Sequence, residues 1–137
     1  MDRETLLRQS DFLSLHVPLT PETQHAIGAR ELALMKPSAF VINAARGPIV
    51  DEEALVQALQ AGRRAGAGLD VFEDEPRVHP ALIAMDDVTL SPHVGSATAD
   101  TRLRMATLAS ENLLAALRGE RPPNLVNPEA WRGPQTT

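Results

Sequence analysis

The sequence predicts an α/β fold built on a parallel sheet of about four strands. Short apolar runs alternate with stretches of helical periodicity along the chain, and this order is typical of parallel strands joined by helical crossovers. Each run is also nearly continuous in apolar residues, as expected for strands that are covered on both faces.

The expected strands cover residues 11–17, 39–43, 65–71 and 88–91. Pro18 and Pro21 end the first of them, because proline marks a turn or loop. The third run, AGAGLDV, consists largely of small residues. This composition suggests close approach by a helix or a ligand.

Helices are expected at residues 3–9, 28–35, 52–61 and 99–118, with one helical turn at 81–85. Asp51 is placed to cap the N-terminus of its helix, and Gly62 and Gly119 follow two helix ends. The longest helix carries an apolar or small stripe at spacings of three and four residues: Leu103, Ala106, Ser110, Leu113 and Leu117. The Pro-rich tail is expected to be extended or loose, so the predicted division is a partial domain at 1–120 and a tail at 121–137.

Composition excludes several classes of function. The 137 residues carry a net charge of −5, which argues against a nucleic-acid partner. There is no cysteine, hence no disulfide framework and no thiolate metal site, and a reducing, cytoplasmic setting fits. No run is long enough to span a membrane, and the N-terminus does not resemble a secretory signal. The four histidines are scattered, so no metal site is expected.

Polar residues cluster where the expected strands end. Arg46 follows the second strand, Asp70 and Glu75 follow the third, and His93 follows the fourth. In open α/β sheets, ligands bind at the carboxyl ends of the strands. We therefore expect these four side chains to converge on one small ligand.

Each of these residues also has a purely structural interpretation. Arg46 is equally explained as an exposed turn residue, and His93 as an ordinary loop histidine. Asp70, taken alone, is better explained as a strand-end residue that accepts backbone N–H bonds.

The remaining polar residues near the strand ends receive weaker interpretations. Glu73 and Asp74 are expected to belong to a solvated acidic loop. His16 also sits at a strand end, where its backbone could face the ligand. His25 and His79 have no pattern around them and are assigned no role.

The four residues together favour one chemistry. A histidine held by a carboxylate is an acid–base group near neutral pH, and an arginine can bind a carboxylate in bidentate fashion. This set fits hydride transfer between a nicotinamide cofactor and a 2-oxo or 2-hydroxy acid. The sequence contains neither a GxSxG elbow nor a GxxxxGK[ST] loop.

Four segments, SDFLSLHVPLTPET, MKPSAFVINAARGPIVDEEAL, AGAGLDVFEDEP and SPHVGSAT, resemble the D-isomer-specific 2-hydroxyacid dehydrogenases. The resemblance covers about residues 4–128, and PHVGSAT with ENLLAALRGERPPNLVNPE is most similar to the glyoxylate and hydroxypyruvate reductase branch. It implies the second half of a Rossmann-type doubly wound parallel sheet, truncated at the N-terminus.

The resemblance also implies roles for individual residues. Arg46 matches the arginine that binds the substrate carboxylate and carbonyl, His93 the general acid, and Glu75 its carboxylate partner. Asp70 matches the residue that contacts the nicotinamide end of the cofactor, and Arg46 and His93 also lie beside it. The further positions that match the cofactor-lining backbone are His16, Val17, Pro18, Ala44, Ala45, Gly95 and Ser96.

The sequence departs from the family at the cofactor fingerprint. GxGxxG is absent, and so is the residue that selects the cofactor, so either NAD or NADP is expected. The alternative to an active enzyme is an inactive truncated remnant, or a half that needs a separate N-terminal chain. Action on another substrate, such as phosphite, is also left open.

The missing half has expected physical consequences. The edge of the first strand and the stripe of the long helix lose their cover, which predicts self-association and weak cofactor binding. A complete enzyme of this kind is expected to form a homodimer.

Overall fold

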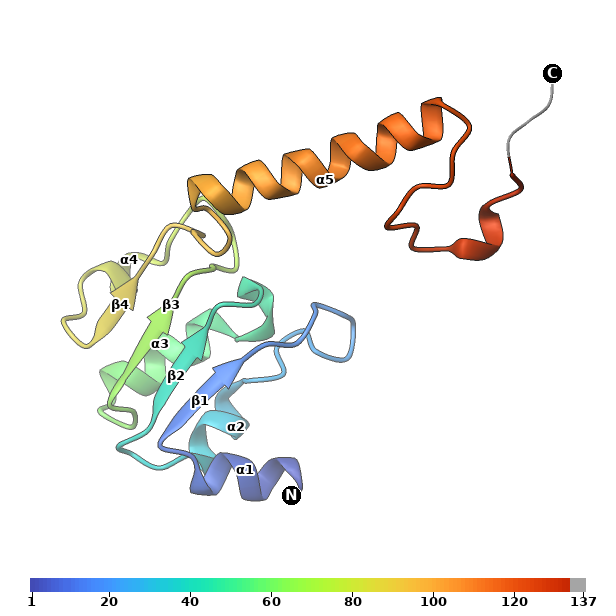
Figure 1. Ribbon diagram of the computed structural model, residues 1–137. Helices are drawn as coiled ribbons and strands as arrows, with labels where there is room; N and C mark the ends of the chain where they lie inside the picture. Colours follow the sequence, from blue (N-terminus) through green and yellow to red (C-terminus); the bar gives the residue numbers. More distant parts are fainter. Residues whose placement is uncertain (134–137) are drawn as a thin grey trace. The chain divides into compact units, whose positions relative to one another are not determined.

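A four-stranded, fully parallel sheet organises the first 95 residues (Figure 1). The computed structural model describes residues 1–133, which form two compact units, Met1–Gly95 and the chain from Ser96 onward. The strands are ordered β1-β2-β3-β4, so the α/β prediction is confirmed. Their bounds are β1 Phe12–Leu15, β2 Phe40–Asn43, β3 Gly66–Leu69 and β4 Val88–Leu90. The helices of this unit are α1 Arg3–Gln9, α2 Ala29–Leu34, the 3₁₀ turn η1 Gly47–Ile49, α3 Glu52–Gln60 and α4 Pro80–Ile83.

The helices follow from local sequence signals. Asp51 caps α3 as predicted, because its carboxylate accepts a hydrogen bond from the amide of Ala54 at 2.9 Å. Gly62 follows the helix with a φ of 62°, a conformation that glycine adopts without strain. A turn is expected from the sequence at Gly47, and the structure forms it as the 3₁₀ helix η1.

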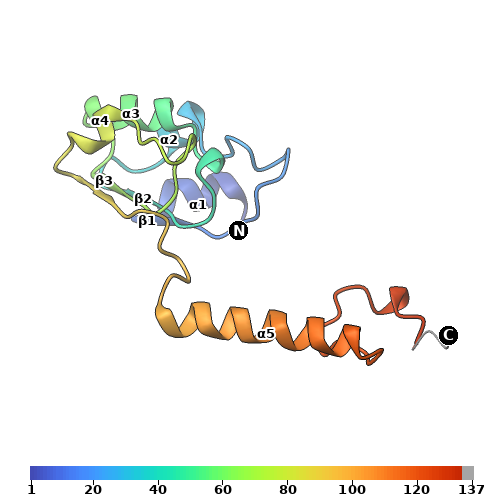
Figure 2. The ribbon, with the colours of Figure 1, turned by 90° about the horizontal axis from the view of Figure 1, so that it is seen from above.

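One face of the sheet is buried. Figure 2 shows α2 and α3 over this face. The sheet contributes side chains such as Leu13, Val41 and Leu69 to the core, and the helices contribute Leu32 and Leu55. Burial of this aliphatic face is the main stabilising term for the unit.

The opposite face is less covered than expected. In β1 the burial pattern alternates, and Phe12 is 68% exposed. Its ring stacks on Phe40 of the adjacent strand, with centroids 5.3 Å apart. The expectation that every strand is covered on both faces is therefore wrong for β1, because the apolar run continues onto a face that no element of this unit buries. The predicted exposure of the first strand is confirmed.

The small residues of β3 make room for neighbouring parts of the same unit. A Cβ on Gly66 would lie 2.3 Å from the carbonyl oxygen of Asp87 and 2.8 Å from the Phe40 ring. A Cβ on Gly68 would lie 3.0 Å from the side chain of Ile42. The glycines thus receive the side chains of β2, rather than the helix or ligand that the composition suggested.

The second unit contains the long helix α5, Ala99–Leu117, and the 3₁₀ turn η2, Pro128–Ala130. Thr98 caps α5, since its hydroxyl accepts from the amide of Thr101 at 3.2 Å. No residue of α5 is buried, so the predicted stripe is uncovered. The compact units part after residue 95, and the division of this chain at residue 120 stays a prediction. Residues 134–137 of the expected tail lie outside the described residues. Within residues 1–133, no helix is both long and apolar enough to cross a membrane.

Candidate active site

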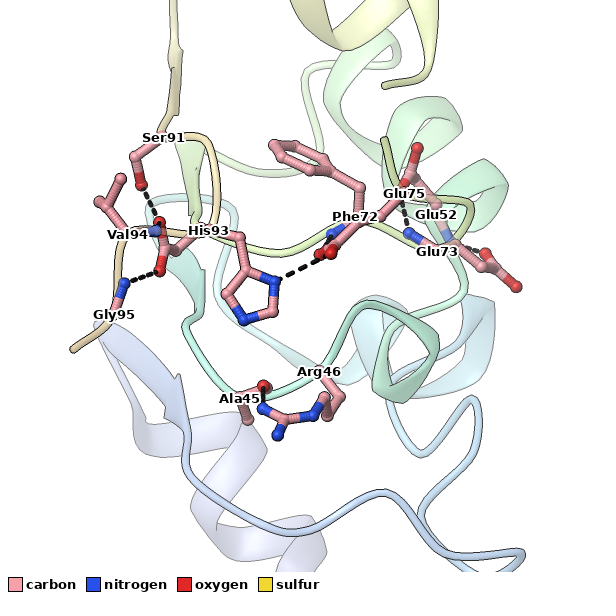
Figure 3. Close-up of polar contacts among 11 residues, drawn as sticks. Ala45, Arg46, Glu52, Phe72, Glu73, Glu75, Ser91, His93, Val94 and Gly95 are labelled. Atoms are coloured by element: carbon pink, nitrogen blue, oxygen red, sulfur yellow. Dashed lines mark hydrogen bonds and ion pairs between the residues drawn. The ribbon is translucent and has the colours of Figure 1, made fainter. Parts of the chain in front are cut away.

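Three loops at the carboxyl ends of β2, β3 and β4 carry the expected catalytic side chains. Figure 3 shows these loops side by side, with Arg46, Glu75 and His93 on them. Each strand is followed within a few residues by its functional group, and the parallel register aligns the strand ends. The structure therefore brings together the residues that the sequence predicted would converge.

His93 and Glu75 form a hydrogen-bonded pair. The ring atom Nδ1 of His93 lies 2.8 Å from Oε2 of Glu75, and the other carboxylate oxygen accepts from the amide of Phe72 at 3.0 Å. The hydrogen bond from His93 is the main cause that lowers the pKa of Glu75, and the Phe72 amide and the charges of His93 and Arg46 act in the same direction. The side chains are 45% and 35% exposed, so the pair is accessible from solvent in this chain.

Asp70 holds the loop that carries His93. Its carboxylate accepts hydrogen bonds from the Ser91 hydroxyl at 2.5 Å and from the amides of Val94 and Gly95 at 2.8 and 2.9 Å (Figure 3). These bonds lower the pKa of Asp70, the Ser91 hydroxyl most strongly. His93 itself has a φ of 51°, which is strained for a residue other than glycine. The structural interpretation of Asp70 is thus confirmed, and its contact with a cofactor stays a prediction.

Arg46 is exposed and lies on a loop whose backbone forms hydrogen bonds with the side chain of Asn43. The buried amide group of Asn43 donates to the carbonyl of Arg46 at 3.0 Å and accepts from the amide of Ala45 at 3.2 Å. The guanidinium donates to the carbonyl of Ala45 at 2.6 Å. In the view of Figure 3, the ring nitrogen of His93 that does not contact Glu75 points to the side where Arg46 lies.

Two hollows flank these residues. A hollow of about 620 Å³ lies between the ends of β1 and β2, and its lining includes the predicted cofactor positions His16, Val17, Pro18, Ala44, Ala45 and Arg46. The His16 ring contacts the Ser14 hydroxyl at 2.7 Å, so that ring is turned back to the strand. A second hollow of about 270 Å³ adjoins His93 and Glu75.

Gly95 joins the predicted set within the first unit, through its bond to Asp70. Ser96 opens the second unit and is not placed against the other residues. The roles of Ser96 and of the other predicted site residues stay predictions.

Several polar contacts near the site were missed from the sequence. Glu73 and Asp74 lie on an exposed loop, as expected. The contacts of the Glu73 carboxylate with the His25 ring at 2.5 Å and with the amide of Glu52 at 3.2 Å were not predicted. His79, to which no role was given, caps α4 by accepting from the amide of Ala81 at 3.2 Å. The contact between His25 and Glu73 joins residues 48 apart, and no local signal predicts it. In the part of the chain that the structure describes, no group of three or more His, Cys, Asp or Glu is arranged to hold a metal ion.

Comparison with known proteins gives consistent matches. The family described as D-isomer specific 2-hydroxyacid dehydrogenase, NAD binding domain, matches residues 1–95. A glyoxylate reductase from Thermococcus litoralis is 58% identical over 127 residues, which cover 93% of this chain and 38% of that protein.

Two solved structures have the same fold. One, from Thermus thermophilus, superposes with a TM-score of 0.88 at 49% identity, and the match covers 92% of this chain and 40% of that chain. An NADPH-dependent glyoxylate/hydroxypyruvate reductase from Sinorhizobium meliloti superposes with a TM-score of 0.81 at 44% identity, covering 88% and 38%. The chain therefore spans about two fifths of the relatives that it matches. It belongs to the NAD-binding-domain family of the D-isomer-specific 2-hydroxyacid dehydrogenases.

Proposed function

We propose that this chain is the catalytic C-terminal part of an NAD(P)-dependent reductase of small 2-oxo acids, with glyoxylate and hydroxypyruvate as its substrates. The observation that carries the proposal is the 2.8 Å contact between His93 and Glu75 on the sheet edge that also carries Arg46. The names of the relatives, which are reductases of these two acids, support the choice of substrate.

His93 is the proton donor in this proposal. With Nδ1 bound to Glu75, the opposite ring atom Nε2 is the one available to a substrate. When the imidazole is protonated, Nε2 donates its proton to the carbonyl oxygen as that oxygen gains negative charge. Glu75 stabilises the protonated ring and fixes its orientation.

Arg46 binds the substrate in this proposal. Its exposed guanidinium contacts the carbonyl of Ala45 and can still pair with the carboxylate of a 2-oxo acid. Such a pair is bidentate and fixes the orientation of the neighbouring carbonyl. Asn43 keeps the arginine in place, because it holds the backbone on both sides of the turn.

The chain fits one part of a dinucleotide. The hollow lined by His16, Val17, Pro18, Ala44 and Ala45 offers backbone at the carboxyl ends of the strands, where dinucleotides bind. When bound, the nicotinamide group supplies the hydride for the reduction. Asp70, Gly95 and Ser96 are further proposed cofactor contacts. The sequence holds neither the glycine-rich turn nor the selecting residue, so both NAD and NADP remain candidates.

The proposal extends to assembly and compartment. A homodimer is proposed for the complete enzyme and self-association for this chain alone, which is supported by the exposed side chains of α5 and by Phe12. The cysteine-free sequence supports a reducing, cytoplasmic compartment.

The test is reduction of glyoxylate and hydroxypyruvate, followed by oxidation of NADH or NADPH. It uses the purified chain alone and the chain mixed with the N-terminal part of the Thermococcus litoralis relative. In an active assembly, His93→Ala and Arg46→Ala are each expected to lower turnover by at least ~10²-fold. Arg30→Ala, which removes an exposed arginine of α2, is the matched control and leaves turnover unchanged.

The outcomes separate the proposal from its alternative. Activity only with the N-terminal part identifies this chain as one half of a split enzyme. No activity under either condition identifies an inactive remnant and refutes the proposed reduction. Near wild-type turnover in His93→Ala refutes the assignment of the proton donor.

A further inference from the structure

Two glutamates link the start of α3 to the loop that carries Glu75. The amide of Glu73 donates to the Glu52 carboxylate at 3.0 Å, and the amide of Glu52 donates to the Glu73 carboxylate at 3.2 Å (Figure 3). The second oxygen of the Glu52 carboxylate accepts from the amide of His79 at 3.2 Å. The loop is thus tied to the helix N-terminus at both of its ends.

His25 secures the same glutamate from another direction. Its Nε2 atom lies 2.5 Å from the Glu73 carboxylate, and its own amide donates to the carbonyl of Pro48 at 2.8 Å. His25 has a φ of 48°, so its backbone is held in a conformation that this residue type rarely adopts. A histidine fixed in this way is a rigid support for Glu73.

Three consecutive acids in this loop have three different partners. Glu73 contacts His25 at 2.5 Å, Asp74 pairs with Arg77 at 2.6 Å, and Glu75 contacts His93 at 2.8 Å. Each carboxylate is chemically able to hold an imidazole. Because Glu73 and Asp74 are bound elsewhere, only Glu75 of the three is left to face His93.

We propose that Glu73, held by His25 and by the amide of Glu52, is a positioning residue that presents Glu75 to His93. This inference rests on the proposed function, since it concerns the same proton donor. The mechanism is geometric: Glu75 lies two residues from Glu73, and its carboxylate also accepts from the amide of Phe72, on the other side of Glu73. Release of Glu73 therefore loosens the loop on both sides of the bond to His93.

The test measures the pKa of the Glu75 carboxyl by ¹³C NMR in the 137-residue chain, from neutral pH to about pH 3. His93→Gln is the reference variant. It removes the imidazole, whose hydrogen bond is the main cause of the lowered pKa of Glu75, so it is expected to raise that pKa. Glu73→Ala is expected to raise the same pKa by at least half of that amount. The sign is decisive, because removing a neighbouring negative charge without moving the loop lowers the pKa of a carboxyl group.

Asp74→Asn is the matched control, because it removes a charge from the same loop but leaves the Glu73 contacts in place. It is expected to lower the pKa of Glu75 or leave it unchanged. A pKa of Glu75 that falls or stays constant in Glu73→Ala overturns the proposal. If Glu73→Ala does not fold, Glu73→Gln decides, because it also removes the negative charge: a smaller rise in the pKa of Glu75 supports the proposal, and a fall or no change overturns it.

This measurement needs no turnover, so it is independent of the reductase assay. A rise in Glu73→Ala without any reductase activity leaves the positioning of Glu75 standing and the proposed function refuted. Reductase activity without a rise in the pKa of Glu75 overturns the positioning role of Glu73 and leaves the proposed function standing.

Discussion

Gly47 lies where the Arg46 loop and the Glu75 loop meet, and its replacement by alanine is expected to disturb both. A Cβ at this position would lie 1.9 Å from the carbonyl oxygen of Phe72, 2.0 Å from its carbonyl carbon and 2.6 Å from the amide nitrogen of Glu73. All three are backbone atoms, so no side chain can swing away. Gly47 is not among the residues with positive φ, so the effect is steric and not conformational.

The size of the effect follows from the displacement that is needed. Ordinary contact begins near 3.4 Å, so the two backbones must separate by more than ~1 Å, and overpacking of this kind costs ~3 kcal/mol of unfolding free energy. A shift of that size at the site is expected to lower turnover of an active assembly by ~10²-fold. Urea denaturation followed by far-UV circular dichroism measures the first quantity.

Gly28→Ala is the matched control for this experiment. Its Cβ would meet nothing closer than 3.6 Å, so a change of less than ~1 kcal/mol is expected from the altered helix N-cap. If the unfolding free energies of Gly47→Ala and Gly28→Ala differ by less than ~0.5 kcal/mol, the close approach of the two loops is refuted.

Three further changes test other features of the molecule. Asp70→Asn removes a charged acceptor, so ~1–3 kcal/mol of unfolding free energy is lost at pH 7. Because the pKa of Asp70 is lowered from 3.8 in the folded state, the stabilisation by its ionised form is present above that pH and is lost as the pH falls through the lowered value. Urea titrations at pH 7 and in acid should therefore show the difference between wild type and variant shrinking in acid, and a constant difference would contradict this. Arg64 is 5% exposed, and its Nε atom has no partner among the described residues. Burial also lowers the pKa of its guanidinium. Because a buried charge of this kind is costly, Arg64→Met is expected to raise Tm by about 5 °C in calorimetry. Arg63→Met, at an exposed neighbour, should leave Tm unchanged, and an equal rise in both variants would show that burial is not the cause. Phe12→Glu is expected to reduce self-association in light scattering, because it replaces an apolar side chain that is 68% exposed; an unchanged mass would exclude this face from the association.

The order of the elements and most of their ends were predictable from the sequence. Apolar runs located all four strands, although each is shorter than expected. End residues of a run belong to the flanking loops, as Val17 does after β1 and Val71 does after β3. Asp51 located the start of α3, because its carboxylate accepts from an amide three positions away. Contacts at this range are readable from the chain itself.

The site was predictable in part for a different reason. Arg46, Glu75 and His93 follow strand ends, and parallel strands bring their ends together whatever the intervening sequence is. The contacts of His25 with Glu73, and of Asn43 with the Arg46 loop, depend on side-chain directions in the folded chain. No pattern of spacing encodes those directions, so the sequence did not predict these contacts.

The glycines of β3 also determine the relief of the uncovered sheet face. The Phe40 ring lies against Gly66, and Ile42 lies against Gly68. Large side chains of β2 therefore lie over the glycines of β3. Side chains of β2 thus occupy the space that side chains at these two positions of β3 would take. Helices that pack on a corrugated surface take their crossing angle from its ridges. An element that packs on this face therefore meets ridges made by Phe40 and Ile42 of β2, and none from Gly66 and Gly68 of β3, so β2 has the larger part in setting its crossing angle.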